Sequence, residues 1–356
     1  MSKELLIFTG AYAEEADKGI GVYRMNEETG QLTELRHFAG LKNPTFIHVD
    51  MDNSRLYAIS EGVNEEGKKI GEAAAFQIGD DRTSLTLINR KPTVQATTCH
   101  IQKDAHNRFL TVTSYHGGMT GLLGLDADGG IGELLDVVQH EGSSVHPNQD
   151  RPHPHSSFYS PDGQYLFVQD LGLDLIVTYR LDAEGGKLIP HHETKLQPGS
   201  GPRHLAIRPG GAFAYVINEL NSTVTAFGYD ADAGKLTELQ TISTLPMDYQ
   251  GDNGCAEIAV SSDGRFLYGS NRGHDSIVVY SIDEESGKLN VIQHMSVGGG
   301  HPRHFALTPS GDYLIAANRD TNNLVTFRVD RLAGTLTPTG HELEASKPVC
   351  VIPVYA

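Results

Sequence analysis

Short apolar runs separated by turn residues follow one another along the chain. Four segments of sixteen residues, 153–168, 201–216, 254–269 and 301–316, align almost without gaps, and 44–59 and 98–113 are looser copies. Each copy has two runs of β-branched and aromatic residues around a turn, which is typical of paired strands. The turns fall 47 to 56 residues apart, at Asn53, Asn107, Gly163, Gly211, Gly264 and Gly311. Gly and Asn tolerate the positive φ that a tight turn demands, so we expect it at these positions.

A third and a fourth strand follow each copy. Apolar runs at 176–179, 224–227, 277–280 and 324–327 are each followed by a turn that ends in Gly and by another short run, as in 230–239 and 283–292. Each unit therefore predicts a four-stranded antiparallel meander.

The two ends of the chain complement each other. Residues 5–10, 21–25 and 32–38 supply the second, third and fourth strands of a unit without a first one, and 348–354 supplies a first strand alone. A blade shared between the termini would close a ring and remove exposed sheet edges. We therefore predict an all-β, seven-bladed β-propeller formed by one domain, 1–356, whose C-terminal strand joins the N-terminal blade. The absence of Trp excludes the Trp-Asp repeat class.

Composition and charge restrict the partners. The 356 residues include 45 acidic and 28 Lys and Arg residues, a net charge of −17, which argues against a nucleic-acid backbone as partner. No apolar run is long enough to span a membrane. The start at Met1 lacks the features of a secretion signal. Cys99, Cys255 and Cys350 are sparse and without metal-site spacing. We expect a cytoplasmic monomer or weak homodimer that binds neither membranes nor nucleic acid.

Two sets of repeat positions should surround one mouth of the central channel. In a meander the start of the innermost strand lies beside the end of the second strand. The first-strand starts are Thr45, Cys99, His155, Arg203, Ala256, Arg303 and Val349, and the second-strand ends are Glu61, Tyr115, Leu171, Glu219, Arg272 and Arg319. Strand-core positions are uniformly apolar, whereas these two columns change chemistry from blade to blade. Positions that depart from a structural repeat are candidates for a functional site.

Four members of these columns come from three consecutive blades: His155, Arg203, Glu219 and Arg272. Cations gathered at one mouth of an acidic protein favour an anion site, because a low-dielectric funnel focuses the field. The alternative is a set of salt bridges between blades, which contribute little when exposed. The column formed by Ser60, Ser114, Asp170, Asn218, Asn271 and Asn318 is polar in every blade, which indicates a repeated structural hydrogen bond.

Four further residues are candidates for substrate binding: His153, His204, Arg303 and His304. His204 and His304 share a register and could instead make structural hydrogen bonds. His153 and His155 alternate along a predicted strand as a metal pair would, but zinc needs three or four ligands. His146, His191 or His192 would have to complete such a site. We therefore expect no metal and no cofactor.

These residues belong to motifs that resemble one family. They are Pro152-His-Pro-His155, Ser160-Pro-Asp-Gly163, Gln169-Asp-Leu-Gly172, Gly201-Pro-Arg-His204, Asn218-Glu-Leu-Asn-Ser222, Ala256-Glu-Ile258, Ser270-Asn-Arg-Gly-His274 and Pro302-Arg-His-Phe305. The chain resembles the seven-bladed propeller lactonases, which include propeller-type 6-phosphogluconolactonases and, more distantly, carboxy-muconate lactonizing enzymes. The resemblance implies a cofactor-independent site with one His, two Arg and one Glu. By motif position these are His155, Arg203, Glu219 and Arg272.

The activity implied by the resemblance is that of a carboxylic ester hydrolase of carbohydrate metabolism, in the pentose phosphate pathway. The expected substrate is a small anionic sugar lactone, 6-phosphogluconolactone, opened to 6-phosphogluconate. His155 or Glu219 would activate water, and a Glu between two Arg has a lowered pKa, which favours His155 as the base.

One of Arg203 and Arg272 would stabilise the oxyanion, and the other, with Arg303 or His304, would hold the phosphate. Two alternatives remain open. One is a non-catalytic propeller that binds an anionic sugar or a protein partner. The other is a muconate-type lactonizing cycloisomerase.

Overall fold

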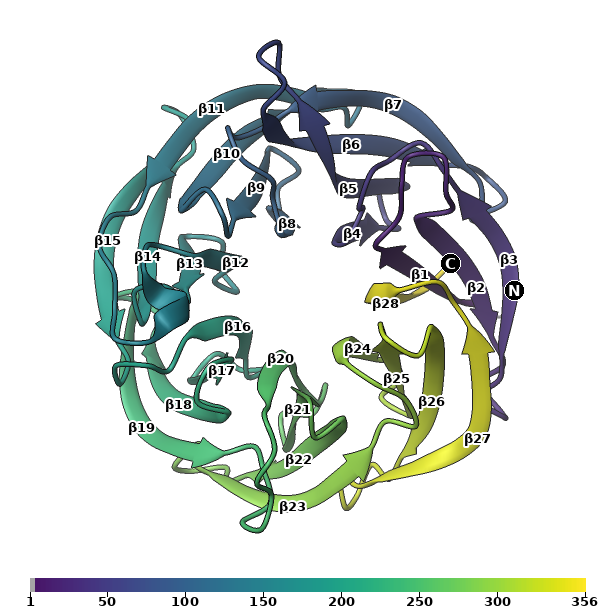
Figure 1. The fold of residues 1–356 in the computed structure, drawn as a ribbon, viewed down its shortest axis with the longest axis vertical. Helices are drawn as coiled ribbons and strands as arrows, with labels where there is room; N and C mark the ends of the chain where they lie inside the picture. The colour runs from purple at the N-terminus through teal and green to yellow at the C-terminus, as the bar shows by residue number, and fades with distance from the viewer. Residues whose placement is uncertain (1–3) are drawn as a thin grey trace.

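Seven four-stranded antiparallel sheets surround a central channel in the computed structural model, which describes residues 4–356 (Figure 1). In each blade the innermost strand lines the channel and the outermost strand lies at the rim. The predicted all-β, seven-bladed propeller is confirmed. The one helix among residues 4–356 is the 3₁₀ turn η1 (Pro147–Gln149), and no helix there has the length and apolarity to cross a membrane.

The strands follow the chain order blade by blade, apart from the shared first blade. Its strands are β28 (Pro348–Tyr355), β1 (Leu5–Ala11), β2 (Ile20–Met25) and β3 (Leu32–Phe38). Blades two to four comprise β4 (Ile47–Asp50), β5 (Arg55–Val63), β6 (Lys69–Ile78), β7 (Leu85–Pro92), β8 (His100–Lys103), β9 (Phe109–Ser114), β10 (Met119–Leu125), β11 (Ile131–Gln139), β12 (Pro154–Tyr159), β13 (Tyr165–Asp170), β14 (Leu175–Asp182) and β15 (Lys187–Lys195). Blades five to seven comprise β16 (Pro202–Ile207), β17 (Phe213–Asn218), β18 (Thr223–Asp230), β19 (Lys235–Ser243), β20 (Gly254–Val260), β21 (Phe266–Arg272), β22 (Ser276–Ile282), β23 (Leu289–Ser296), β24 (Pro302–Leu307), β25 (Tyr313–Asn318), β26 (Asn323–Val329) and β27 (Leu336–Glu344).

The ring closes where the sequence predicts it. β28 pairs antiparallel with β1, from Leu5 opposite Tyr355 to Ala11 opposite Pro348. The two ends of the described chain therefore lie in the same blade (Figure 1). The prediction that the start at Met1 carries no secretion signal falls in part on residues 1–3, which lie outside the described residues.

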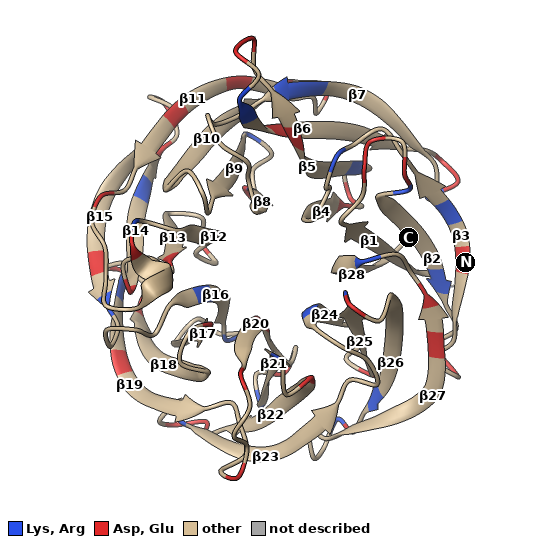
Figure 2. Ribbon diagram, viewed as in Figure 1, with Lys and Arg blue, Asp and Glu red and all other residues tan. Residues whose placement is uncertain are grey.

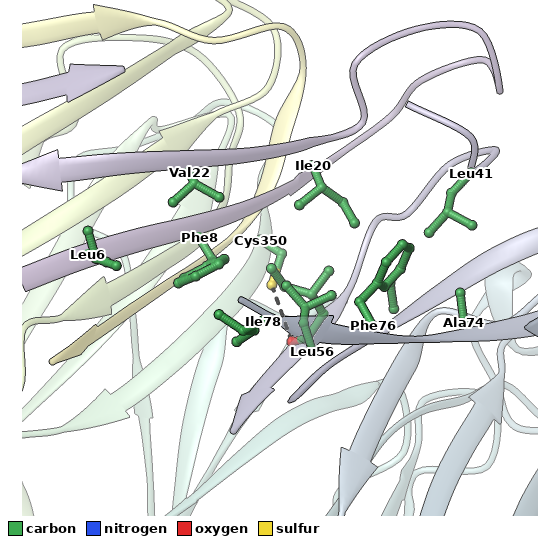
Figure 3. Packing of buried hydrophobic residues seen from close by; sticks show 12 residues of the cluster. Leu6, Phe8, Ile20, Val22, Leu41, Leu56, Ala74, Phe76, Ile78 and Cys350 are labelled. Carbon is green, nitrogen blue, oxygen red and sulfur yellow. Dashed lines mark hydrogen bonds between the residues drawn. The ribbon is translucent and has the colours of Figure 1, made fainter. Parts of the chain in front are cut away.

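Apolar side chains hold adjacent blades together. Each of the seven hydrophobic clusters lies between two neighbouring sheets. At the junction of the first and second blades, Phe8 and Cys350 of the first blade meet Leu56 and Phe76 of the second (Figure 3). Burying a side chain of this size contributes about 1.5–3 kcal/mol. Each blade is thus stabilised mainly by its two neighbours.

Second-strand tyrosines add a repeated polar contact between blades. Their hydroxyl groups donate to a backbone carbonyl in the turn between the third and fourth strands of the next blade. The pairs are Tyr57 with Gly129, Tyr165 with Asp232, Tyr215 with Gly287, Tyr268 with Gly334 and Tyr313 with Glu27, at 2.9–3.0 Å. Each hydroxyl group therefore links the second strand of one blade to the outer hairpin of the next blade.

The predicted turn conformations are confirmed at five of the six positions. Asn107, Gly163, Gly211, Gly264 and Gly311 all have positive φ. The prediction for Asn53 is wrong, because Ser54 has the positive φ of 53° instead. The Asp50 carboxylate accepts hydrogen bonds from both the backbone and the side chain of Asn53, at 3.1 and 2.9 Å. This local Asx turn places the left-handed residue one position later.

The polar column at the ends of the second strands makes the predicted structural hydrogen bonds in five blades. The side chains of Ser60, Ser114, Asn271 and Asn318 donate to a backbone carbonyl, and Asp170 accepts from the backbone N–H of His153. Asn218 bonds the hydroxyl groups of Thr223 and Thr225 instead. These contacts fix the loops that carry the mouth residues.

Two glycines with similar backbones provide a test of packing between blades. A Cβ at Gly334 (φ +75°) would collide with the Phe266 ring of the preceding blade, whereas a Cβ at Gly340 (φ +81°) would meet nothing within 4 Å. We expect Gly340→Ala to cost about 1 kcal/mol of unfolding free energy through its backbone alone. Gly334→Ala should cost about 1–3 kcal/mol more because of overpacking. Urea unfolding of both variants measures the difference, and equal losses would contradict this packing account.

Candidate active site

A cavity of about 280 Å³ lies at the mouth where the first strands begin. Thr45, Cys99, His155 and Arg303 from the column of first-strand starts line it, as do Glu61, Tyr115 and Glu219 from the column of second-strand ends. The two predicted columns therefore meet around one cavity. Figure 2 shows basic residues beside this part of the channel, at β16, β24 and next to β28.

Glu219 holds two arginines from different blades. It follows β17, and its Oε2 lies 3.1 Å from Nε of Arg203 on β16 and 2.9 Å from Nη2 of Arg272 at the end of β21. The structure thus brings together three of the four residues predicted to be catalytic. The ion pair between Arg272 and Glu219 joins the sixth blade to the fifth. The alternative interpretation, a set of salt bridges between blades, therefore holds for this pair.

The two guanidinium groups lie behind Glu219 and outside the lining of the cavity. Arg203 donates from Nη1 to the carbonyl of Ala256 at 2.6 Å, and Arg272 donates to the carbonyls of Gly254 and Cys255 at 3.0 and 2.6 Å. Their side chains are 3% and 8% exposed, against 23% for Glu219. Backbone carbonyls and one carboxylate therefore position both cations, and they in turn fix the Glu219 carboxylate at the cavity wall.

The electrostatics of this cluster keep Glu219 ionised. Burial alone would raise its pKa, but the charges of Arg272, Arg203 and Arg303 outweigh this effect and lower the pKa. Burial and the neighbouring Arg303 and Arg272 lower the pKa of Arg203 in turn, which shows how closely the positive charges are crowded. Because its Oε2 already lies against both guanidinium groups, Glu219 is suited to orienting the arginines.

His155 is the fourth predicted catalytic residue, and it lines the same cavity from β12. It is 4% exposed, and neither ring nitrogen has a hydrogen-bond partner among residues 4–356. Its backbone carbonyl accepts a hydrogen bond from the Cys99 thiol at 3.1 Å. Burial, followed by the charge of Arg203, lowers the pKa of the imidazole well below its ordinary value. The wall of the cavity therefore contains a neutral imidazole whose Nδ1 is buried without a partner among residues 4–356.

Arg303 also lines the cavity, and its guanidinium group is unpaired. Within residues 4–356 no carboxylate oxygen lies within 4.0 Å of it, and it makes no side-chain hydrogen bond. Half-buried guanidinium groups without a counter-ion attract oxyanions, which they can bind with two parallel hydrogen bonds. Arg303 is therefore the most available cation of the site.

The other three predicted substrate-binding residues do not line the cavity. The His153 ring stacks on Tyr115 with ring centroids 4.2 Å apart, and its Nδ1 lies 2.7 Å from the Tyr115 carbonyl oxygen. His204 Nδ1 and His304 Nε2 each lie 3.1 Å from Oε2 of Glu257 on β20. These contacts favour supporting roles, and direct substrate contact by these three residues stays a prediction.

Aromatic and imidazole rings pack against His155 and against one another. His204 contacts His155, His100 and Phe46, with ring centroids 5.3, 5.6 and 6.0 Å apart. Burial lowers the pKa of His304 to about 4 and raises the pKa of Glu257. Both shifts disfavour charge on these buried groups. Over residues 4–356, no group of three or more His, Cys, Asp or Glu side chains is arranged to hold a metal ion.

Comparison with known proteins identifies the family. The model of the family described as "Lactonase, 7-bladed beta-propeller" matches residues 6–353. The chain belongs to this family. The 6-phosphogluconolactonase of Bacillus subtilis is 33% identical over 302 residues, which cover 85% of this chain and 84% of that protein. The 6-phosphogluconolactonase of Formosa agariphila is 34% identical over 311 residues, covering 85% and 86% of the two chains.

Solved structures of related propellers superpose along the whole chain. The periplasmic gluconolactonase of Pseudomonas aeruginosa has a TM-score of 0.92 and 32% identity and covers 99% of both chains. A Lactobacillus plantarum protein has a TM-score of 0.90 and 30% identity, also with 99% of both chains covered. The predicted membership of the lactonase family is therefore confirmed.

Several residues of this lactonase's cavity escaped the sequence argument. Tyr12, Asn43, Thr97, Thr98 and His116 line it from connections between strands, outside the aligned columns. Glu257 was noticed only as part of a motif. An alignment of the repeats identifies equivalent positions in the strands. It cannot identify equivalent positions in the loops, because these differ in length from blade to blade. The Asn43 side chain donates to Glu61, a column member, at 2.8 Å, but this contact exists only in the folded chain and leaves no signal in the sequence.

Removal of the central carboxylate tests the electrostatic account. Glu219→Gln leaves two buried guanidinium groups without a counter-charge, and breaking a buried pair costs about 3–5 kcal/mol. We expect a lower Tm that added phosphate or sulfate partly restores, because an anion that binds the folded state stabilises it. Thermal unfolding with and without salt measures this.

Glu4→Gln is the matched control, because Glu4 pairs with Arg24 at an exposed site. An equal response of both variants to the anions would contradict a cationic cluster held by Glu219.

Proposed function

We propose that this lactonase hydrolyses a sugar lactone, with 6-phosphogluconolactone as substrate and 6-phosphogluconate as product. The observation that carries the proposal is the pair of unpartnered groups in one cavity, the neutral imidazole of His155 and the guanidinium group of Arg303. Relatives named 6-phosphogluconolactonase and a neighbour named gluconolactonase support the substrate class.

The reaction needs a base and an oxyanion site. His155 removes a proton from water while the water oxygen forms a bond to the lactone carbonyl carbon. The carbonyl electron pair moves to its oxygen, and the tetrahedral oxyanion then collapses as the ring C–O bond breaks. The imidazolium returns its proton to the leaving ring oxygen, and the new carboxylic acid loses a proton to solvent. General-base catalysis contributes about 10²–10⁴ in rate, and one oxyanion donor about 10²–10³.

The cationic wall serves the oxyanion. Arg303 binds the carbonyl oxygen directly, since it has no protein partner to give up. Arg203 and Arg272 add to the positive potential from behind Glu219, at 3.1 and 2.9 Å from its carboxylate. Glu219 holds that wall in place and leaves the proton transfer to His155. Burial of Arg203 and Arg272 reduces the screening of their charges by solvent.

Three of the original expectations remain proposals. These are the cytoplasmic location, the monomeric or weakly dimeric state and the place in the pentose phosphate pathway. The three cysteines are free thiols, which suits a reducing compartment. The described residues form no disulfide, and Cys255 and Cys350 are buried in the propeller.

Turnover of the phospholactone above its spontaneous hydrolysis is the first test. We expect His155→Asn to lower kcat by about 10²–10⁴, because the base is lost, with a smaller change in KM. His192→Asn, at a half-buried rim position outside the cavity, is the matched control and should leave both constants unchanged. Tight binding of the lactone without turnover would instead support the non-catalytic propeller. Formation of a muconolactone from a carboxylated muconate would support the cycloisomerase.

The pH dependence of kcat/KM tests the assignment of the base. Because the pKa of His155 lies well below 6.5, the imidazole is neutral at pH 7 and becomes protonated only in acid. The acid limb of kcat/KM should therefore have its midpoint below pH 6.5, with no loss between pH 6.5 and 7.5. Stopped-flow assays, corrected for spontaneous hydrolysis, measure it. A midpoint at or above 6.5 would contradict a buried His155 as base.

A further inference from the structure

A second cavity adjoins the active-site cavity at the seam where the ring closes. It has a volume of about 520 Å³ and is lined by Tyr12, Asn43, Arg319, Asp320, Asn322 and Lys347. Tyr12 and Asn43 line both cavities, so the two are neighbours that share part of their wall. A ligand that passes Tyr12 and Asn43 would reach from His155 and Arg303 to the side chains of Arg319 and Lys347.

The outer cavity has its own positive charges. Among residues 4–356, no carboxylate oxygen lies within 4.0 Å of the Lys347 ammonium group. Arg319 uses Nε for Asp320, at 2.6 Å, and Nη2 for His301, at 3.4 Å, which leaves Nη1 without a protein partner. Asp320 is itself held by Arg319 and His301 and offsets one positive charge. The two cations, Lys347 and Arg319, outnumber the one carboxylate, Asp320, so the net charge is positive. His301 adds no charge at neutral pH, because burial, followed by Arg272 and Arg319, lowers its pKa to about 4.

The backbone fixes Lys347 in an uncommon conformation. Its φ is +41°, which is rare for a residue with a side chain. Its N–H donates to Asn322 Oδ1 at 2.9 Å, and its carbonyl accepts from Tyr12 N–H at 3.2 Å. Such strain persists only where surrounding contacts impose it, and it clusters at functional positions. The closure of the ring therefore places a lysine at the edge of the active-site cavity.

The inner cavity alone is small for a phosphorylated sugar. Its volume of about 280 Å³ lies at the lower end of the roughly 300–1,000 Å³ of small-molecule sites. If Arg303 binds the carbonyl oxygen, the outer cavity is the neighbouring space that can take a phosphate at the far end of the sugar. Lys and Arg together suit a phosphate, which Arg binds through its planar fork and Lys as a point charge.

We propose that Arg319 and Lys347 form an outer anion subsite that binds the phosphate of the substrate, while the lactone ring occupies the inner cavity. This assignment rests on the proposed function, since it takes the carbonyl group to lie against His155 and Arg303. It differs from the expectation that Arg203 or Arg272, together with Arg303 or His304, would hold the phosphate. The product carries anionic groups at both ends and would match both cavities.

Steady-state kinetics with two lactones test the subsite. Lys347→Met and Arg319→Gln remove one charge each, and Lys68→Met is the matched control, at an exposed position of the β5–β6 hairpin. We expect each subsite variant to raise KM for 6-phosphogluconolactone about tenfold, the loss of one charge-assisted hydrogen bond, with kcat nearly unchanged. Gluconolactone, which lacks the phosphate, should have unchanged constants. Equal effects on both lactones, or none on either, would overturn the proposal.

Calorimetry separates this proposal from the proposed function. Native protein should bind 6-phosphogluconate about tenfold more tightly than gluconate, and Lys347→Met should lose that difference. If native protein binds both ligands equally, or if only Arg303→Met removes the preference, the outer subsite is wrong. If the phospholactone is not turned over but Lys347→Met loses the preference, the proposed function fails and the anion subsite stands.

Discussion

The pairing of β28 with β1 is the constraint on which the rest of the structure depends. Each blade has an apolar cluster on both sides, so an open ring would expose two of these surfaces and two strand edges. Closure also gathers residues that are far apart in the sequence around one mouth. His155, Glu219 and Arg303 come from three different blades and line one cavity. The site is therefore a consequence of the ring, and no single blade contains it.

The chemistry of the mouth depends on an imbalance of buried charge. Arg203 and Arg272 pair with one carboxylate, Glu219, whose pKa the charge of Arg303 also lowers, while burial lowers the pKa of the neighbouring His204. Removing water from such a cluster strengthens every remaining interaction. An anionic ligand would offset the excess of positive charge at this mouth. Without that local positive charge, a protein with a net charge of −17 would repel an anion. The same burial keeps the His155 imidazole in its neutral form.

Most of the fold could be predicted from the sequence, because each blade corresponds to one copy of a sequence repeat. Strand positions follow from turns spaced at regular intervals, and complementary half-blades at the two ends required closure. Chemistry-bearing positions were found where the repeat changes, as at His155 and Glu219. Details that depend on neighbouring atoms were not accessible. The hydrogen bonds of Asp50 move the left-handed residue from Asn53 to Ser54, and carbonyls of β20 hold Arg203 and Arg272 behind Glu219. Loop residues such as Tyr12 and Lys347 reach the mouth only through the folded ring.

A crystal structure with bound 6-phosphogluconate is the most direct test of the central claim that this mouth is where the lactone reacts. The account predicts ligand density in the cavity lined by His155, Glu219 and Arg303, with the carboxylate within hydrogen-bond distance of Arg303 and His155. Density at the opposite mouth of the channel, with this cavity empty at saturating ligand, would contradict it.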